Sequence, residues 1–382
     1  MLLLVVLAVM ACFALMRVCF LVTNKPRSPS SRVCVVLGSG GHTSELLDII
    51  GSIDNSQWLR MEPLYVVSTT DKHSERFARE FEGRNGRREC SVAFIPRARE
   101  VGQSYFTSIG TTLRAIFASF RVVYRHNAST ILCNGPGVCV PIVIADLMMA
   151  CVTFRRRARL GYFESFTCVD HLSASGTLLR RVSDVFTVQW PGLSSPVIEF
   201  VSPFAVGDDR PLLTMNRAKK AIVTVGSTKF DLLMQSIDTP LFFAALKRFG
   251  FDHVLIQYGT SEYTFKHSDG AGTGVRVELV KYKPELSKEF SSVGLLITHG
   301  GAATILEALR ARTTCVAVPN TMLMSDHQSG FARALHRKHL LVACAAHEIV
   351  QTLANGDFSS LVEFHESKAE RYAPYLRRLL QQ

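Results

Sequence analysis

A chain of 382 residues, 47% hydrophobic and 20% charged, is too long for one ordinary domain and too apolar for a disordered protein, so two globular domains are expected. The ten cysteines form no C-x-x-C pair and no cluster with histidine, which excludes an evident zinc motif and favours a reducing, cytosolic setting. A net charge of +11 indicates attraction to phosphates or an anionic membrane, and no zinc spacing, aromatic RNA motif or basic helix supports nucleic acid.

The chain begins with an apolar run, Leu2–Val22, that is long enough to cross a bilayer as a helix. A cleaved signal peptide is the alternative, but it would have a basic start and a shorter apolar stretch. Lys25, Arg27 and Arg32 follow the run and no basic residue precedes it, so the following domains are expected in the cytosol. We therefore expect residues 1–24 to form a transmembrane anchor.

Short apolar runs alternate with helix-like or loop-like segments through residues 25–201. This alternation predicts a parallel sheet covered by helices, which is a Rossmann-like domain. The predicted strands are Val33–Leu37, Leu64–Val67, Val92–Ile95, Thr130–Cys133 and Leu160–Phe163.

Residues 202–220, rich in Pro, Gly and Asp, are expected to link this domain to a second one at 221–382. Open parallel sheets bind ligands beyond the carboxyl ends of their strands, so two such domains facing a cleft suit two substrates. The predicted strands of the second domain are Ala221–Val225, Val254–Gln257, Val275–Val280, Gly294–Thr298 and Thr314–Val318.

Two glycine-rich turns, Gly38–His42 and His299–Ala302, each lead from a predicted strand into a predicted helix. Small residues there let backbone N–H groups approach a phosphate, and a helix N-terminus favours negative charge. The first turn is no dinucleotide fingerprint, because Thr43 replaces the third glycine. Either turn alone could be purely structural, but one in each domain favours a bound ligand.

Other polar residues follow the second turn. Glu307 lies one helical turn further on and could bind sugar or ribose hydroxyls, although without further context an ordinary solvated helix glutamate is the favoured interpretation. Ser325–Gln328 is expected either to contact a ligand or to start a helix.

The segment Tyr105–Tyr124 has apolar residues at helical spacing with arginines among them. A core-facing helix and an interfacial helix on an anionic bilayer are equally open interpretations. The arginines of Arg155–Arg159 are expected to form a solvated loop.

Ordered motifs in the first domain resemble the membrane-anchored acceptor subunit of the dolichol-linked UDP-GlcNAc transferase that adds the second sugar of the N-glycan precursor. These motifs are Leu37-Gly-Ser-Gly-Gly-His-Thr-Ser-Glu45, Ile95-Pro-Arg-Ala-Arg-Glu-Val-Gly-Gln-Ser104, Asn134-Gly-Pro-Gly137 and Val188-Gln-Trp-Pro191.

Motifs in the second domain are similar to the soluble donor-binding subunit of the same enzyme. They are Val225-Gly-Ser-Thr-Lys-Phe-Asp231, Ile256-Gln-Tyr-Gly259, Ile297-Thr-His-Gly-Gly-Ala302 and Leu323-Met-Ser-Asp-His-Gln328. The family more often has histidine-alanine-glycine where this chain has His299-Gly300-Gly301, and a threonine at Ser227. Both exchanges are expected to preserve donor binding.

The resemblance implies a natural fusion of both subunits with the α/β GT-B fold: two Rossmann-like domains, and an N-terminal transmembrane helix that anchors the chain to the endoplasmic reticulum with its domains on the cytosolic face. It implies transfer of GlcNAc from UDP-GlcNAc to dolichyl-diphosphate-GlcNAc with inversion to a β1,4 bond, and other early dolichol-pathway enzymes as possible partners. A UDP-sugar epimerase and a non-catalytic membrane scaffold are the alternatives.

The resemblance also assigns roles to residues. We expect His42 to be the general base, with Glu164 as second candidate. No metal or other cofactor is expected, because the chain has no Asp-x-Asp sequence. The expected acceptor-binding residues are Gly38, Ser39, Gly40, Gly41, Thr43, Asn134 and Gly135. The expected donor-binding residues are Gly226, Ser227, Tyr258, His299, Gly300, Gly301, Ala302, Glu307, Asp326, His327 and Gln328.

Overall fold

The computed structural model describes residues 26–71, 73–98, 103, 107–204, 211–212, 218–320, 327–356, 358–365 and 369–381. The predicted anchor at residues 1–24 lies outside the described residues, as do Arg99–Gly102 and Ser104 of the second acceptor motif. Among the helices that the structure describes, none is both long and apolar enough to cross a membrane.

The chain forms two compact units, residues 1–202 together with 368–382, and residues 203–367. The division after Ser202 agrees with the start of the predicted linker. The C-terminal boundary differs from the prediction, since the last fifteen residues belong to the first unit and not to a domain at 221–382. Part of the predicted linker also belongs to a folded unit, because Leu212 is buried in the second core and its N–H bonds to Leu361 O at 2.7 Å.

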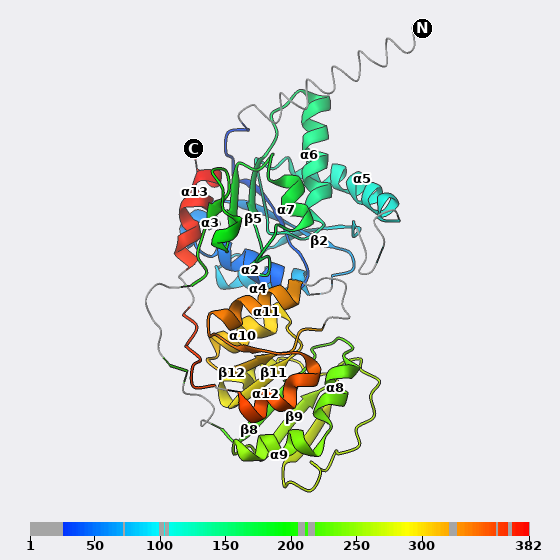
Figure 1. The fold of residues 1–382 in the computed structure, drawn as a ribbon. Helices are drawn as coiled ribbons and strands as arrows, with labels where there is room; N and C mark the ends of the chain where they lie inside the picture. The colour runs from blue at the N-terminus through cyan, green and yellow to red at the C-terminus, as the bar shows by residue number, and fades with distance from the viewer. Residues whose placement is uncertain are drawn as a thin grey trace, which may run out of the picture. The chain divides into compact units, whose positions relative to one another are not determined.

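The first unit has a seven-stranded parallel sheet in the order β3-β2-β1-β4-β5-β6-β7 (Figure 1). All five predicted strands of this unit are confirmed, whereas β6 and β7 were not predicted as strands. The strands are β1 (Arg32–Val36), β2 (Glu62–Ser68), β3 (Ser91–Ile95), β4 (Thr130–Cys133), β5 (Arg159–Phe163), β6 (Val185–Val188) and β7 (Glu199–Phe200).

Helices cover both faces of this sheet. Alternate residues of β1 explain this, since Val33 and Val35 belong to one buried cluster while Cys34 and Val36 belong to another. The first cluster lies under α2 (Gly41–Ile50), α3 (Asn55–Leu59), α4 (Ser74–Arg84) and α13 (Ala373–Leu380). The second lies under α5 (Ser108–His126), α6 (Cys139–Thr153) and α7 (Ala174–Leu179). Two short 3-10 helices are η1 (Pro191–Leu193) and η4 (Ala369–Tyr372).

The C-terminal helix α13 is an integral part of the first core. Leu376, Leu379 and Leu380 are buried with residues of β1 and α2. Gly161 of β5 makes room for this contact, because a Cβ atom there would lie 2.4 Å from Leu379 Cδ1. The chain therefore returns to its first unit after completing the second.

The second unit has a six-stranded parallel sheet in the order β10-β9-β8-β11-β12-β13. All five predicted strands are confirmed here, and the short β13 was not predicted. The strands are β8 (Lys220–Thr224), β9 (His253–Gln257), β10 (Arg276–Val280), β11 (Leu295–Thr298), β12 (Thr314–Ala317) and β13 (Val342–Ala343). The helices are α8 (Asp231–Ile237), α9 (Pro240–Arg248), η2 (Leu286–Ser292), α10 (Ala302–Arg310), α11 (His327–Arg337), η3 (Ala346–Glu348) and α12 (Ile349–Asn355).

The arginine-rich loop after α6 is held by ion pairs, so the predicted solvated loop is wrong for these residues. Arg157 is buried and forms a bidentate pair with Asp184 at 2.6 and 2.9 Å. Arg155 pairs with Asp146 at 2.8 Å. The guanidinium of Arg159 donates to the Arg378 carbonyl at 2.9 Å, so the loop also holds α13 in place.

Candidate active site

The first glycine turn connects the carboxyl end of β1 to α2. Gly40 has φ 64°, which glycine adopts without strain, and it precedes the first residue of the helix. Gly38 approaches the neighbouring turn after β4 so closely that a Cβ atom would lie 2.5 Å from Pro136 Cβ. No side chain caps α2, and its first turn has no acidic residue, so the helix N-terminus is open to an anion.

His42, in the first turn of α2, is held by the turn after β4. Its Nδ1 lies 3.0 Å from the carbonyl oxygen of Asn134, and the Asn134 amide donates to the His42 carbonyl at 2.7 Å. Because a carbonyl only accepts, Nδ1 carries the proton and Nε2 carries the lone pair. Burial lowers the pKa of His42, which keeps the imidazole neutral. The ring is thus prepared to accept a proton at Nε2.

Gly135 brings the two predicted catalytic residues together. A Cβ atom on Gly135, whose φ is 107°, would lie 3.4 Å from His42 Cε1 and 3.5 Å from Glu164 Oε1. The Tyr162 hydroxyl is 3.6 Å from the same point. Asn134 and Gly135 therefore act here as the frame that positions His42 beside Glu164.

Glu164 follows β5 and is almost completely buried. Its Oε1 accepts from the Ser165 N–H at 3.2 Å, and its Oε2 accepts from the Ser173 N–H and hydroxyl at 3.0 and 3.1 Å. Burial raises the pKa of Glu164. Since both oxygens already accept hydrogen bonds, the geometry favours His42 over Glu164 as the base.

Glu45 is a functional candidate that the sequence analysis did not single out. It lies about one turn after His42 on α2, and its carboxylate accepts from the Phe166 N–H at 2.8 Å, the Gln189 amide, and the Asn134 amide at 3.3 Å. Burial raises the pKa of Glu45 to about 7. The carboxylate thereby connects α2 to the loops that follow β4, β5 and β6.

The other predicted acceptor residues fall into two groups. Ser39 and Gly40 are exposed and Gly41 is partly exposed, so a ligand can reach them. Thr43 is fully buried, with its hydroxyl bonded to the Gly38 carbonyl and to the Ser74 hydroxyl. Thr43 therefore stabilises the turn from within.

In the second unit, the turns after β8 and β9 lie side by side. Gly226 has φ 63° and Gly259 has φ 61°. A Cβ atom on Gly259 would lie 2.3 Å from the Thr228 carbonyl oxygen, so only glycine fits. Gln257 links the two turns, because its amide donates to Thr224 Oγ1 at 3.0 Å and to the Gly226 carbonyl at 3.1 Å.

The imidazole of His299, directly after β11, is buried against two glycines. A Cβ atom on Gly301 would lie 2.7 Å from His299 Nε2, and one on Gly226 would lie 3.3 Å from His299 Cε1. Burial lowers the pKa of His299, so the ring is neutral. The ring occupies the space that side chains at both glycine positions would need.

The second glycine turn ends at the N-terminus of α10, which begins at Ala302. Neither a side-chain cap nor an acidic residue occupies its first turn, as in α2. Gly300 has φ 84°, which alanine adopts only with strain. An alanine at this position would be strained in this backbone conformation, and the expectation that the exchange preserves donor binding stays a prediction.

The remaining predicted donor residues are less uniform. Ser227 and Glu307 are exposed, whereas Tyr258 packs against the core beside Phe265. The Gln328 side-chain oxygen is buried and has no hydrogen-bond partner among the described residues. Asp326 lies outside the described residues, and His327 is described only as the first residue of α11. Ligand contacts of the predicted site residues stay predictions.

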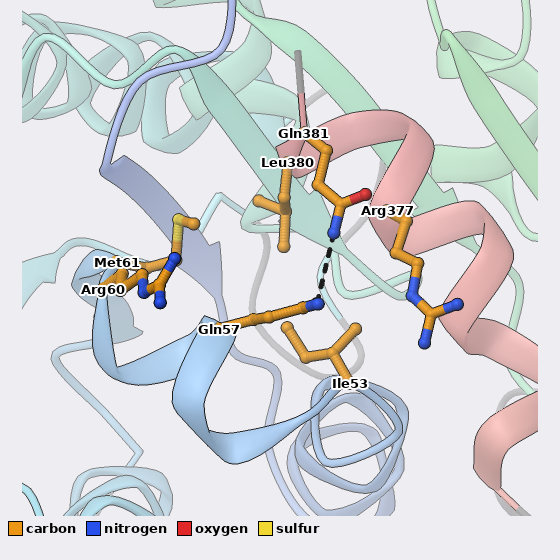
Figure 2. Close-up of a pocket in the computed structure, with 7 residues that line it drawn as sticks. All are labelled: Ile53, Gln57, Arg60, Met61, Arg377, Leu380 and Gln381. Atoms are coloured by element: carbon orange, nitrogen blue, oxygen red, sulfur yellow. Dashed lines mark hydrogen bonds between the residues drawn. The ribbon is translucent and has the colours of Figure 1, made fainter.

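A cavity of about 170 Å³ in the first unit lies elsewhere, between α3 and α13 (Figure 2). Met61, which lines it, directly precedes β2, so the cavity lies at the amino ends of the strands. Gly38 and Asn134 follow the carboxyl ends of parallel strands. The cavity is therefore separate from the candidate site.

Solved structures of other proteins share this two-unit architecture. MurG of Acinetobacter baumannii matches with a TM-score of 0.58 and 15% identity over 91% of this chain and 98% of that one. A putative UDP-N-acetylglucosamine 2-epimerase from Listeria monocytogenes matches with a TM-score of 0.57 and 10% identity over 92% and 96%. The fold alone therefore does not choose between a transferase and an epimerase.

Family models match both halves of the chain. Residues 33–201 match the model described as oligosaccharide biosynthesis protein Alg14 like, and residues 221–376 match the glycosyltransferase family 28 C-terminal domain. The UDP-N-acetylglucosamine transferase subunit ALG14 of Homo sapiens is 36% identical over 192 residues, which cover 48% of this chain and 87% of the relative. The corresponding subunit of Candida albicans is 37% identical over 166 residues, 42% of this chain and 72% of the relative.

Two Rossmann-like units, each with a glycine-rich turn opening a helix, together with the family 28 domain, define a glycosyltransferase of the GT-B fold. The chain belongs to the Alg14 family and carries a family 28 domain in the same polypeptide. The predicted fusion is confirmed by these matches.

Proposed function

We propose that this protein transfers GlcNAc from UDP-GlcNAc to dolichyl-diphosphate-GlcNAc and forms the β1,4-linked disaccharide lipid. The observation that carries the proposal is the convergence of His42 and Glu164 at Gly135 in the Alg14-like unit. The names of the human and Candida relatives, which are UDP-N-acetylglucosamine transferase subunits, support the choice of donor.

On the donor side, the open N-terminus of α10 binds the UDP diphosphate. Negative charge grows on this group as the glycosidic bond breaks, so N–H groups of Gly301 and Ala302 stabilise the transition state more than the ground state. The unpartnered oxygen of Gln328 and the carboxylate of Glu307 accept hydrogen bonds from sugar or ribose hydroxyls.

On the acceptor side, the Gly38–Gly41 turn binds the lipid diphosphate and His42 takes the proton. The acceptor 4-hydroxyl oxygen forms a bond to the anomeric carbon, the bond from that carbon to UDP breaks, and UDP leaves with the electron pair. The hydroxyl proton moves to Nε2 of His42. Attack opposite to the leaving group inverts the anomeric configuration.

The proposed reaction needs no metal, because backbone N–H groups neutralise the leaving diphosphate. The proposed location is the cytosolic face of the endoplasmic reticulum, with the apolar run at Leu2–Val22 as a single-pass anchor. Other early dolichol-pathway enzymes are proposed partners, since they supply and consume the same lipid.

Product analysis tests the proposal. Purified full-length protein is incubated with labelled UDP-GlcNAc and phytanyl-diphosphate-GlcNAc, with and without EDTA, and the lipid is examined by mass spectrometry and by a β1,4-specific glycosidase. We expect one added GlcNAc that the glycosidase releases, at the same rate with EDTA. Conversion of UDP-GlcNAc to an epimer without lipid product would contradict the proposal.

A further inference from the structure

The helix α5 exposes large apolar side chains and buries small ones. Ala115, Ser119 and Val123 face the core. The exposed stripe consists of Ile109, Leu113, Phe117 and Tyr124. Of the two interpretations left open by the sequence, a core-facing helix therefore fails for these four residues. An exposed apolar stripe of this kind marks an interaction surface.

Basic residues border this stripe, and α5 contains no acidic residue. Arg114, Arg121 and Arg125 are all exposed on the helix. The neighbouring helix α6, which packs against α5 (Figure 1), has a single carboxylate, Asp146, and it is paired with Arg27 and Arg155. We call the four apolar residues and the three arginines the α5 face. Its charge is complementary to an anionic surface.

Arg27, which follows the apolar N-terminal run in the sequence, contacts α6 and the residue just after α5. The Arg27 guanidinium donates to Asn127 Oδ1, just after α5, at 2.6 Å, and to Asp146 of α6 at 3.3 Å. Asn127 also accepts from Arg155, which follows α6, at 3.1 Å. In the sequence, only four residues separate Arg27 from Val22, the last residue of the apolar run.

More apolar side chains are exposed at this same end. Val152 and Phe154 lie at the end of α6, beside Arg155, and Tyr124 lies one turn before Asn127. Exposed apolar residues and arginines are therefore found close to Arg27, near the start of the described chain. A protein partner would need carboxylates and apolar groups at matching positions. An anionic bilayer presents negative charge and apolar acyl chains over its whole surface.

We infer that the α5 face binds the surface of a bilayer containing anionic lipids, with the apolar stripe in the headgroup and acyl boundary. This inference concerns how the first unit is held at the membrane, and it stands independently of the proposed reaction. Contact through α5 fixes the orientation of the first unit on the bilayer surface.

Fluorescence quenching in the full-length protein tests the inference. The native Trp58 and Trp190 are buried, with 2% and 6% exposure, so Phe117→Trp adds an exposed indole at a position that is 74% exposed. The protein is reconstituted into vesicles of equal parts phosphatidylcholine and phosphatidylserine with brominated acyl chains. Val197→Trp is the matched control, because Val197 is 75% exposed beside β7, at the opposite sheet edge from β3, against which α5 packs.

We expect strong quenching of the tryptophan at position 117 and none at position 197. The combined change Arg114→Glu, Arg121→Glu and Arg125→Glu should weaken surface binding at least a hundredfold, since each arginine contributes roughly fivefold, and should abolish quenching at position 117. Transfer to a short-chain, detergent-soluble acceptor should be unchanged in this variant.

Two results would overturn the inference. Quenching at position 117 no stronger than at position 197 would mean that protein or water, and not lipid, covers the stripe. Quenching that survives the charge reversal would exclude an anionic surface as the binding partner.

Discussion

At the scale of single residues, His42 is the base that the geometry supports. Its Nδ1 is fixed by the Asn134 carbonyl at 3.0 Å, and Nε2 is left to accept a proton. We predict that His42→Ala lowers kcat by about 10²–10⁴-fold while leaving the affinity for UDP-GlcNAc unchanged. Steady-state kinetics and donor titration measure the two effects, with exposed His73→Ala as the matched control. A kcat close to that of the native protein would move the role to Glu164.

Glu45 gives a prediction about pH. Burial raises the pKa of this carboxyl from 4.5 to about 7, and the ionised form accepts from the Phe166 N–H and the Gln189 amide. We expect kcat/KM to fall as pH drops through about 7, because protonation disturbs these contacts. The contribution of Glu45 to folding has the opposite sign: it is greatest below pH 4.5 and is lost as pH rises through about 7.

The variant Glu45→Gln checks this assignment. It should have a lower kcat/KM without a step near pH 7, and its melting temperature should lose the part of the pH dependence that Glu45 causes. A step near pH 7 that persists in the variant would assign the titration to another group.

The third prediction concerns the steric fit of His299 and Gly301. Gly301→Ala places a methyl group 2.7 Å from His299 Nε2, so the ring must move. We predict at least a tenfold loss of UDP-GlcNAc affinity for Gly301→Ala and complete loss for Gly301→Trp, measured by calorimetry. In a His299→Ala background, Gly301→Ala should have almost no further effect. Equal losses in both backgrounds would show that the two residues are not coupled.

The sequence identified His42, Glu164 and the glycine turns because they directly follow strands with clear apolar patterns. It did not identify Glu45, whose partners Phe166 and Gln189 lie 121 and 144 positions away along the chain. Gln189 belongs to the motif Val188–Pro191 and Glu45 ends the motif Leu37–Glu45, whereas Phe166 lies outside the motifs, so a polar contact between these two motifs was the available signal. The positive φ of Gly300 could not be read from residue type, because it depends on the folded backbone.

At the scale of helices and strands, α13 shows where local patterns are insufficient. Residues 373–380 were assigned to the second domain at 221–382, because a local sequence pattern does not show which sheet a segment covers. The contact between Leu379 and Gly161 places it in the first unit instead. The short strands β7 and β13, of two residues each, also lack a pattern long enough to detect.

This position of α13 leads to a stability prediction. Leu379→Ala should destabilise the first unit by about 2–5 kcal/mol, because it leaves a cavity against β5. Arg377→Ala, on the exposed side of the same helix, is the control and should change stability by less than about 0.5 kcal/mol. Thermal melting followed by the fluorescence of Trp58 in this unit measures both, and equal effects would contradict the assignment of α13 to the first core.

At the scale of the whole molecule, one polypeptide combines an Alg14-like unit with a family 28 domain. Both units have parallel sheets and glycine turns that open helices, and the alternation of apolar runs was sufficient to predict them. The chain also returns to its first unit through α13, so the polypeptide passes between the two units twice.

We propose that this single chain, with an Alg14-like unit and a family 28 domain, transfers GlcNAc without a second subunit. The most direct measurement is the initial rate of GlcNAc transfer to phytanyl-diphosphate-GlcNAc by the protein purified to a single polypeptide. We expect turnover to be proportional to protein concentration and unchanged when a separate donor-binding subunit is added. Turnover that occurs only after such a subunit is supplied would contradict it.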